Sequence, residues 1–128
     1  MGGRISGETA FRRSRRTITV AQPAAGTDWT YTVPAGHVYR LEAVRYRFVA
    51  DATDTSRTIG LVLTDGNAQV ARAGLSGLPG ASADLIASYW RDAALSSDGA
   101  GYTAPFPVLD LQAGWTIGTS TGNIQSGD

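Results

Sequence analysis

The sequence contains no cysteine and no lysine, and only one of its 128 residues is a histidine. Without cysteine, neither disulfides nor cysteine-ligated metal sites can stabilise the fold, and the chain is compatible with folding in a reducing cytoplasm. Without lysine, a glycine-rich phosphate loop of the nucleotide-binding type is excluded, because that loop requires its lysine. The single histidine, His37, cannot form a two-histidine metal site. We therefore expect no cofactor and no metal.

Long apolar runs are also missing. No segment approaches the ~20 consecutive apolar residues that span a membrane, so we expect no membrane partner. The N-terminal arginines are not followed by the apolar region of a secretory signal. With 42% hydrophobic residues among 128, the chain is large enough for one domain with a single core.

The charges are divided unevenly along the chain. Residues 1–16 hold five of the 11 arginines and one glutamate, a net charge of +4, whereas residues 17–128 carry −4. Residues 1–16 have little apolar surface to bury, so we expect an extended basic arm there and a folded domain over 17–128. The candidate partner-binding residues of this arm are Phe11, Arg12, Arg13, Arg15 and Arg16.

The arm has three interpretations. It is a solvated tail, a clamp for phosphates, or a contact with the acidic surface of a protein. Of the two binding interpretations we favour a protein partner over nucleic acid. The rest of the chain is acidic, and no basic surface with interleaved aromatic residues continues the arm into a groove.

The stretch 33–49 is the best-defined β pattern. It begins with a turn that contains Pro34 and Gly36. Apolar residues then alternate with charged ones in two runs, 39–43 and 44–48, whose phases differ by one residue. A single straight strand cannot place both runs on one face. The phase change therefore predicts a bulge or a strand that passes from one sheet to another.

Further strands are predicted where short β-branched or alternating segments are bounded by turn residues. These segments are 17–20, 29–33, 57–64, 68–73, 84–91, 106–111 and 115–119. Residues 84–91 also fit a short helix by their apolar spacing, but the neighbouring strands favour a strand there. Asp65-Gly66-Asn67 predicts a tight hairpin turn. We expect an all-β fold, a single antiparallel jelly roll or β-sandwich of about eight strands.

The remaining segments are predicted to be loops. Residues 74–82 form a loop that contains Leu75 and Leu78, which either plug the open end of a sandwich or contact another subunit. Residues 92–104 form a second long loop. The chain ends on turn residues, 122–128. Such an ending precedes another strand, leaves room for a neighbouring subunit, or frays, and we favour fraying.

No catalytic constellation is present in the sequence. His37 follows a turn, and no Gly-x-Ser-x-Gly motif occurs. The aspartates at 51, 54 and 65 are oxygen ligands of the kind that hard cations prefer, but we interpret them as solvated loop residues. Asp92 and Asp98 lie in one loop without a cleft for a sugar. Trp29 and Trp115 are in phase with core residues, which leaves Trp90 as the candidate for stacking on a ligand.

Two parts of the chain together resemble small all-β virion proteins of tailed bacteriophages. The first is about 30–66, with Val33-Pro34-Ala35-Gly36 and the segment from Arg57 to Gly66. The second is 107–128, with Leu109-Asp110-Leu111-Gln112-Ala113-Gly114-Trp115 and the final Gly127-Asp128. These are strand and turn motifs rather than active-site motifs. The resemblance implies a jelly roll that serves as a structural component of a phage particle.

We therefore expect a capsid decoration (cement) protein on the outer surface of the virion capsid, made in the host cytoplasm. Its partners would be the major capsid protein and copies of itself in a homotrimer. The arm and the leucines Leu75 and Leu78 would make the contacts. The alternative is a tail or fibre module that binds another tail protein, or a host-surface glycan through Trp90 and the loop 92–104. An enzyme is a distant third hypothesis.

Overall fold

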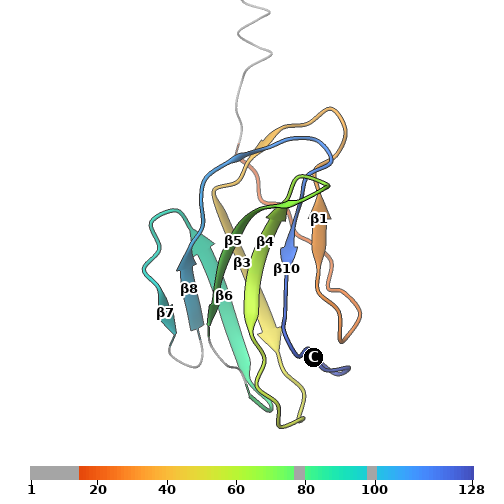
Figure 1. Cartoon of the computed structure of the whole chain (residues 1–128), viewed down its shortest axis with the longest axis vertical. Helices are drawn as coiled ribbons and strands as arrows, with labels where there is room; N and C mark the ends of the chain where they lie inside the picture. The colour runs from red at the N-terminus through yellow and green to blue at the C-terminus, as the bar shows by residue number, and fades with distance from the viewer. Residues whose placement is uncertain (1–14, 77–79, 98–100) are drawn as a thin grey trace, which may run out of the picture.

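The computed structural model describes residues 15–76, 80–97 and 101–128, and in this part of the chain it contains strands and no helix (Figure 1). The strands are β1 (Thr30–Thr32), β2 (Tyr39–Arg40), β3 (Ala43–Val49), β4 (Ile59–Thr64), β5 (Gln69–Ser76), β6 (Asp84–Trp90), β7 (Ser96–Ser97), β8 (Gly101–Pro105), β9 (Asp110–Leu111) and β10 (Thr116–Thr119). The all-β expectation is confirmed. Within the described ranges there is no helix long and apolar enough to cross a membrane.

The strands form two four-stranded sheets and one small sheet. The first sheet has the order β1-β10-β4-β5, the second has β3-β6-β8-β7, and β2 pairs with β9. The pairs are antiparallel except β6 with β8, which run parallel. The described residues thus form ten strands rather than about eight. The β4–β5 hairpin stays within one sheet and β6 is parallel to β8, so the jelly-roll order is not confirmed.

Side chains from both four-stranded sheets form one buried cluster. In β4 the alternate residues Ile59, Leu61 and Leu63 are all completely buried, as the period-two pattern predicts. Burying each such side chain contributes about 1.5–3 kcal/mol relative to exposure. The second sheet contributes Phe48, Leu85, Ala87, Tyr89, Tyr102 and Ala104. The arrangement is therefore a sandwich of two sheets around a shared core.

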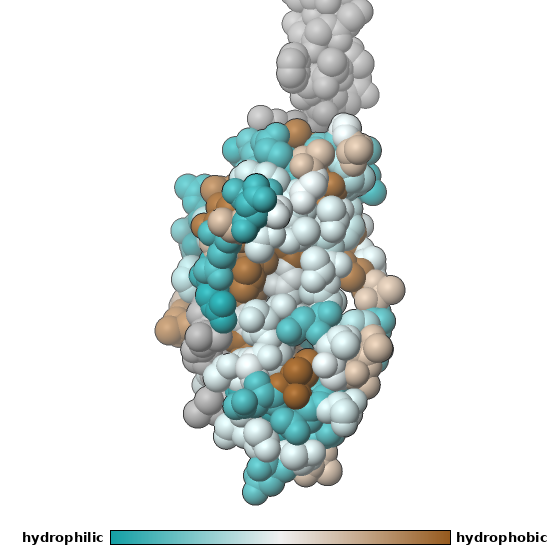
Figure 2. Space-filling view, turned by 45° about the vertical axis from the view of Figure 1, so that its right-hand side comes forward, coloured by the Kyte–Doolittle hydropathy of each residue, from teal (hydrophilic) through white to brown (hydrophobic). Residues whose placement is uncertain are grey.

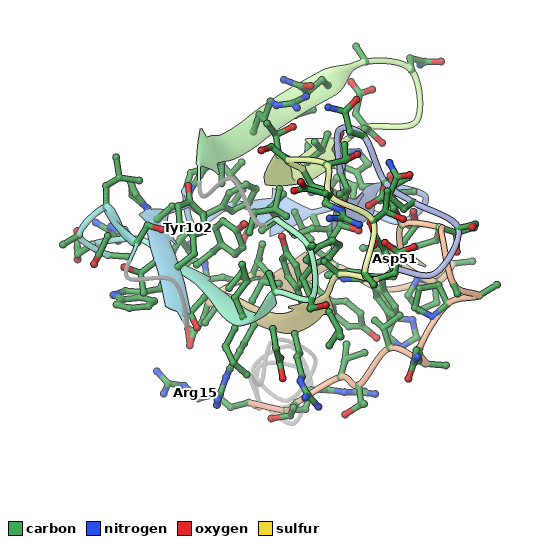
Figure 3. The ribbon with its side chains drawn as sticks, turned by 90° about the horizontal axis from the view of Figure 1, so that it is seen from below. Arg15, Asp51 and Tyr102 are labelled. Atoms are coloured by element: carbon green, nitrogen blue, oxygen red, sulfur yellow. The ribbon has the colours of Figure 1, made fainter. Side chains whose placement is uncertain are left out.

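Three tyrosines run across the inner face of the second sheet. Tyr89 stacks on Tyr46 with ring centres 5.9 Å apart and meets Tyr102 edge-on at 5.9 Å. The hydroxyls of Tyr46 and Tyr89 lie 3.2 Å apart and share a hydrogen bond. Burial raises the pKa of Tyr89 to about 12, so this hydroxyl remains protonated near neutral pH. Figure 3 shows Tyr102 between the two sheets.

The stretch 39–49 passes from one sheet to another, as its phase change predicts. β2 pairs with β9 in the small sheet, and β3 pairs with β6 in the second large sheet. Leu41 and Glu42 lie between them and belong to neither strand. Val44, Tyr46 and Phe48 of β3 turn toward the core, whereas Ala43 is exposed. The break therefore restores the inward orientation of the apolar residues.

Several predicted boundaries are wrong. Thr17–Val20 has β-branched residues but forms no strand, because nothing pairs with it in the described structure. The loop predicted over 92–104 contains β7 and β8, since Tyr102 and Ala104 alternate into the core and hold β8 against β6. The strand predicted over 106–111 is reduced to β9.

The loop predicted over 74–82 also needs correction. β5 continues to Ser76, which pairs with Ile59 of β4, so Leu75 lies in a strand rather than in a loop.

The Asp65-Gly66-Asn67 turn is confirmed. Gly66 has a φ of 98°, and the Asp65 carboxylate accepts hydrogen bonds from the N–H groups of Asn67 and Ala68, both at 2.9 Å.

Candidate functional site

One side of the sandwich is open. The first sheet ends there at β1 and the second at β3, and these two strands are not paired with each other. Between them lies a groove with a volume of about 2270 Å³. One wall is β3. Another includes Trp29, which directly precedes β1, and Tyr31, which belongs to β1. Residues 17–25, which we call the strap, line its outer side. An opening at the right of Figure 2 lies on this side of the molecule.

The arm meets the domain through exposed contacts at one end of this groove. The guanidinium of Arg15 lies 3.5 Å from the Glu42 carboxylate, and 91% of the Arg15 side chain is exposed. The guanidinium carbon of Arg16 lies 5.9 Å from the centre of the Tyr39 ring. Tyr39 stacks on Tyr31 with ring centres 6.5 Å apart. Exposed pairs of this kind contribute little stability, so the arm is held weakly.

The strap reaches the C-terminal segment at the other end of the groove. Directly after the strap, the N–H of Gly26 donates a hydrogen bond of 3.0 Å to the carbonyl oxygen of Asp128. Gly26 has a φ of 80°, and a Cβ there would lie 3.0 Å from the Cα of Ser126. A glycine is therefore required where these two segments meet.

The C-terminal segment is fixed by a buried ionic cluster, the Arg57 cluster, formed by Asp51, Arg57 and Asp128. The Arg57 side chain is completely buried. Its Nε donates to Asp128 at 2.9 Å, and its Nη2 donates to Asp128 at 2.8 Å and to Asp51 at 2.6 Å. Its Nη1 donates to the carbonyl oxygens of Thr53 at 3.0 Å and Thr55 at 2.8 Å. Every polar group of this guanidinium thus has a partner, which a buried charge requires.

The two carboxylates are satisfied from the backbone as well. Asp128 accepts hydrogen bonds from the N–H groups of Asp51 and Gln125, both at 2.8 Å, and Asp51 accepts one from Thr53 at 2.9 Å. Burial opposes the ionisation of Asp128, but the hydrogen bonds from Arg57 and the backbone outweigh it and lower its pKa. The hydrogen bond from Thr53 lowers the pKa of Asp51. Hydrogen bonding to Asp128 raises the pKa of Arg57.

The Arg57 cluster corrects two sequence-based expectations. The sequence favours a frayed chain end, yet the Asp128 side chain is fully buried against Arg57. Figure 3 shows Asp51 beside the C-terminal segment. The sequence favours a solvated loop position for Asp51, but its carboxylate accepts a hydrogen bond from Arg57 and forms an ion pair with it. No group of three or more potential metal ligands occurs in the described part of the chain.

A sequence signal for this cluster existed. Arg57 is in phase with Ile59 and Leu61, so the period-two pattern places it on the inner face of the β4 run. A buried arginine requires a carboxylate, but the sequence does not indicate which of the aspartates supplies it. Asp128 is 71 residues away from Arg57 in the chain.

A second candidate surface is the outer face of the β3-β6-β8 sheet. Trp90 is 42% exposed there and stands in register with Ala43 and Pro105. The next row but one contains Arg45, Ser88 and Thr103. Residues on adjacent strands that are offset by two positions lie about 7–8 Å apart, so Arg45 and Trp90 are diagonal neighbours.

The two arginines on this face differ in their partners. The Nε and Nη2 of Arg47 donate to the two Asp84 carboxylate oxygens at 2.8 and 2.6 Å. Arg45 is exposed and has no hydrogen bond or ion pair to any other described residue. Arg45 is therefore the cation that is available on this face.

The predicted site residues that the structure describes fall in three places, the groove, the outer sheet face and strand β5, which contains Leu75. Arg15 and Arg16 lie at the groove, and Trp90 is on the outer sheet face, so the structure does not bring these residues together. Phe11, Arg12, Arg13 and Leu78 lie outside the described residues. His37 is exposed, with its Nδ1 3.1 Å from the Ala35 carbonyl oxygen. Trp29 and Trp115 pack against the core, as predicted.

Comparisons with models of protein families, with curated proteins and with solved structures gave no match for this chain.

Proposed function

We propose that this protein is a structural component of a bacteriophage particle and acts as a decoration protein on the outer surface of the capsid. The observation that carries the proposal is the exposure of Arg15, with 91% of its side chain in solvent. Arg15 and Arg16 lie where the basic arm joins the packed domain. Among the described residues, only weak surface contacts hold them there. Arg15 and Arg16 can exchange these contacts for an acidic surface on the major capsid protein.

The proposed mechanism depends on many weak contacts that act together. A single arginine arm binds weakly at physiological salt, because surface ion pairs are screened. Several arms on one oligomer bind far more tightly through their effective concentration. An acidic domain of net charge −4 would not adhere to packaged DNA, which agrees with a position on the outer surface.

The jelly roll and the homotrimer belong to this proposal. In the order β1-β10-β4, the last strand of the chain, β10, lies between β1, the first strand, and β4, the strand that follows β3. A jelly roll has the same arrangement at the corresponding end, which supports a derived jelly roll. A trimer would present three arms to adjacent capsid subunits.

Co-sedimentation with mature, undecorated capsids tests the proposal. We expect saturable binding by the full chain that weakens as the salt concentration rises, and loss of binding when residues 1–16 are deleted. The double variant Arg15→Gln/Arg16→Gln should weaken binding about tenfold or more. The matched control Arg72→Gln/Arg91→Gln removes the same charge from the domain and should bind normally. Saturable binding by the deletion variant would contradict the role of the arm.

A second candidate function is favoured by the outer face of the β3-β6-β8 sheet. Trp90 offers an exposed ring for stacking on a sugar, Ser88 and Thr103 carry hydroxyls, and Arg45 is a cation without a partner among the described residues. This combination suits an acidic glycan, as a tail or fibre module would encounter on a host surface. Trp90 alone would suit neutral sugars equally well.

A glycan array distinguishes this candidate from capsid decoration. Binding to uronic-acid or sialic-acid glycans should be lost in Trp90→Ala and weakened in Arg45→Gln. The matched control Arg47→Gln removes an arginine that already pairs with Asp84, and it should leave glycan binding nearly unchanged. If no glycan on the array gives a signal, the glycan-binding candidate is wrong and capsid decoration is the remaining proposal.

A further inference from the structure

The free edge of β3 is the longest unpaired strand edge on the open side of the sandwich. All seven residues of β3, Ala43–Val49, are in register with β6 on one side. Its other side has no strand partner in the described structure. The unpaired N–H and C=O groups of an edge strand are a template for a further strand.

The strap has the sequence of a strand and lies along this edge without pairing. Thr17-Ile18-Thr19-Val20 is rich in β-branched residues, and Ile18 remains 36% exposed. The arm contacts Tyr39 and Glu42 before β3 begins, and Gly26 contacts Asp128 beside the far end of β3. The strap therefore runs in the same direction as β3, as Figure 1 shows, with the groove between them.

We propose that the free edge of β3 binds the Thr17–Val20 segment of a second copy of this chain. The segment supplies the only β-rich stretch of the described residues that has no partner. Ile18 and Val20 alternate, so they would cover the half-buried row of Val44 and Tyr46 while the threonines face solvent. An arm of net charge +4 meeting a domain of net charge −4 gives two copies complementary charges.

The strap of the same chain is poorly placed to fill this edge. Just after its C-terminal end, the N–H of Gly26 donates a hydrogen bond to Asp128, and the chain then leads within a few residues into β1 of the opposite sheet. The same segment of a neighbouring copy is held in this way to its own domain, not to the domain whose β3 it would pair with. Exchange of an identical element between copies is a low-cost route to an oligomer. This inference holds whether or not the protein belongs to a phage capsid.

Cysteine cross-linking tests the exchange, because the chain has no cysteine of its own. Two single variants, Thr19→Cys and Arg45→Cys, are tagged differently, mixed and mildly oxidised. Side chains on adjacent strands lie about 4.5–5.5 Å apart, close enough for a disulfide. We expect a mixed covalent dimer at least tenfold more abundant than in the matched mixture of Thr19→Cys with Arg72→Cys. Arg72 is equally an exposed arginine on an edge strand, β5.

Two further measurements keep the inference falsifiable. The double variant Thr19→Cys/Arg45→Cys should form linked oligomers. If it forms only internally linked monomers, the strap closes on its own β3 and the inference is wrong. Thr19→Pro removes a backbone donor and should convert the oligomer to a monomer in sedimentation analysis with the fold retained. Equal cross-linking at Arg45 and Arg72, or no mixed dimer, would also overturn it.

Discussion

The two ends of the described chain are anchored in opposite ways. At the C-terminal end, the side chain of Asp128 is completely buried and accepts two hydrogen bonds from the guanidinium of Arg57. At the N-terminal end, Arg15 and Arg16 rest on exposed side chains, and the strap has no strand partner in the described structure. Both ends use arginine, but only the buried one is surrounded by a full set of acceptors. Burial therefore decides which arginines fix the fold and which are available to a partner.

Disrupting the Arg57 cluster should lower the stability of the fold more than any other change proposed for the two ends. Asp128→Ala leaves the buried Arg57 without its main partner, and removing one member of a buried ion pair is strongly destabilising. We expect the Tm to fall by about 10–20 °C in thermal unfolding followed by circular dichroism. The matched variant at the other end, Glu42→Ala, should change the Tm by less than about 3 °C. Equal effects would contradict the contrast.

A smaller change at the C-terminal end tests how tightly the cluster is packed. A Cβ at Gly127 would lie 2.9 Å from the Cβ and from a carboxylate oxygen of Asp51. Gly127→Ala should therefore displace Asp51 and lower the Tm by about 3–8 °C. Gly80→Ala is the control, because a Cβ there meets nothing within 4 Å. If the two variants are equally stable, the segment is not packed against Asp51.

Acid should weaken the C-terminal anchor selectively. The folded-state pKa values of Asp51 and Asp128 are lowered, so the unfolded chain binds protons more readily than the folded one. Their contribution to stability is present above the ordinary carboxyl pKa of about 3.9 and is lost as the pH falls through the lower folded values. We expect the Tm to drop steeply below about pH 4, and less steeply in Asp128→Asn. Parallel curves for the two proteins would contradict this assignment.

The smallest effect on stability is expected at Tyr39. Tyr39→Leu removes the ring beneath Arg16 but keeps an apolar side chain against Tyr31 and the core. It should change the Tm by less than about 3 °C, because an exposed cation–π contact is worth about 0.5–1 kcal/mol. The same variant should release the arm, which limited trypsin digestion after Arg15 and Arg16 would detect as faster cleavage. Unchanged cleavage would show that Tyr39 does not hold the arm.

Alternation was enough to predict the strands whose inner face is strongly apolar. Ile59, Leu61 and Leu63 fixed the orientation of β4. The phase change at 43–44 indicated either a bulge or a strand that changes sheets, and the structure has the second. β8 was missed because its inward residues, Tyr102 and Ala104, lie among glycine, serine and aspartate. Thr17–Val20 was overpredicted, since β propensity does not supply a partner strand.

The candidate site was less predictable than the fold. The sequence alone pointed to Trp90 and to the arginine-rich arm. It did not point to the Arg57 cluster, because that cluster joins residues 71 positions apart. Only the folded chain brings Asp51 and Asp128 to the same guanidinium. Likewise, Asp84 of β6 neutralises Arg47 but not Arg45. This difference follows from the register in which β3 pairs with β6, which sequence alone does not provide.

Amide hydrogen exchange along the full chain, measured at a dilution where it is monomeric, tests the contrast between the two ends most directly. The account predicts that the amides of Thr17–Val20 exchange at nearly the unprotected rate. The amides of Asp51 and Gln125, which donate to Asp128, should be protected about as strongly as those of the core strands. Strong protection of Thr17–Val20 in the monomer, or rapid exchange at Gln125, would contradict it.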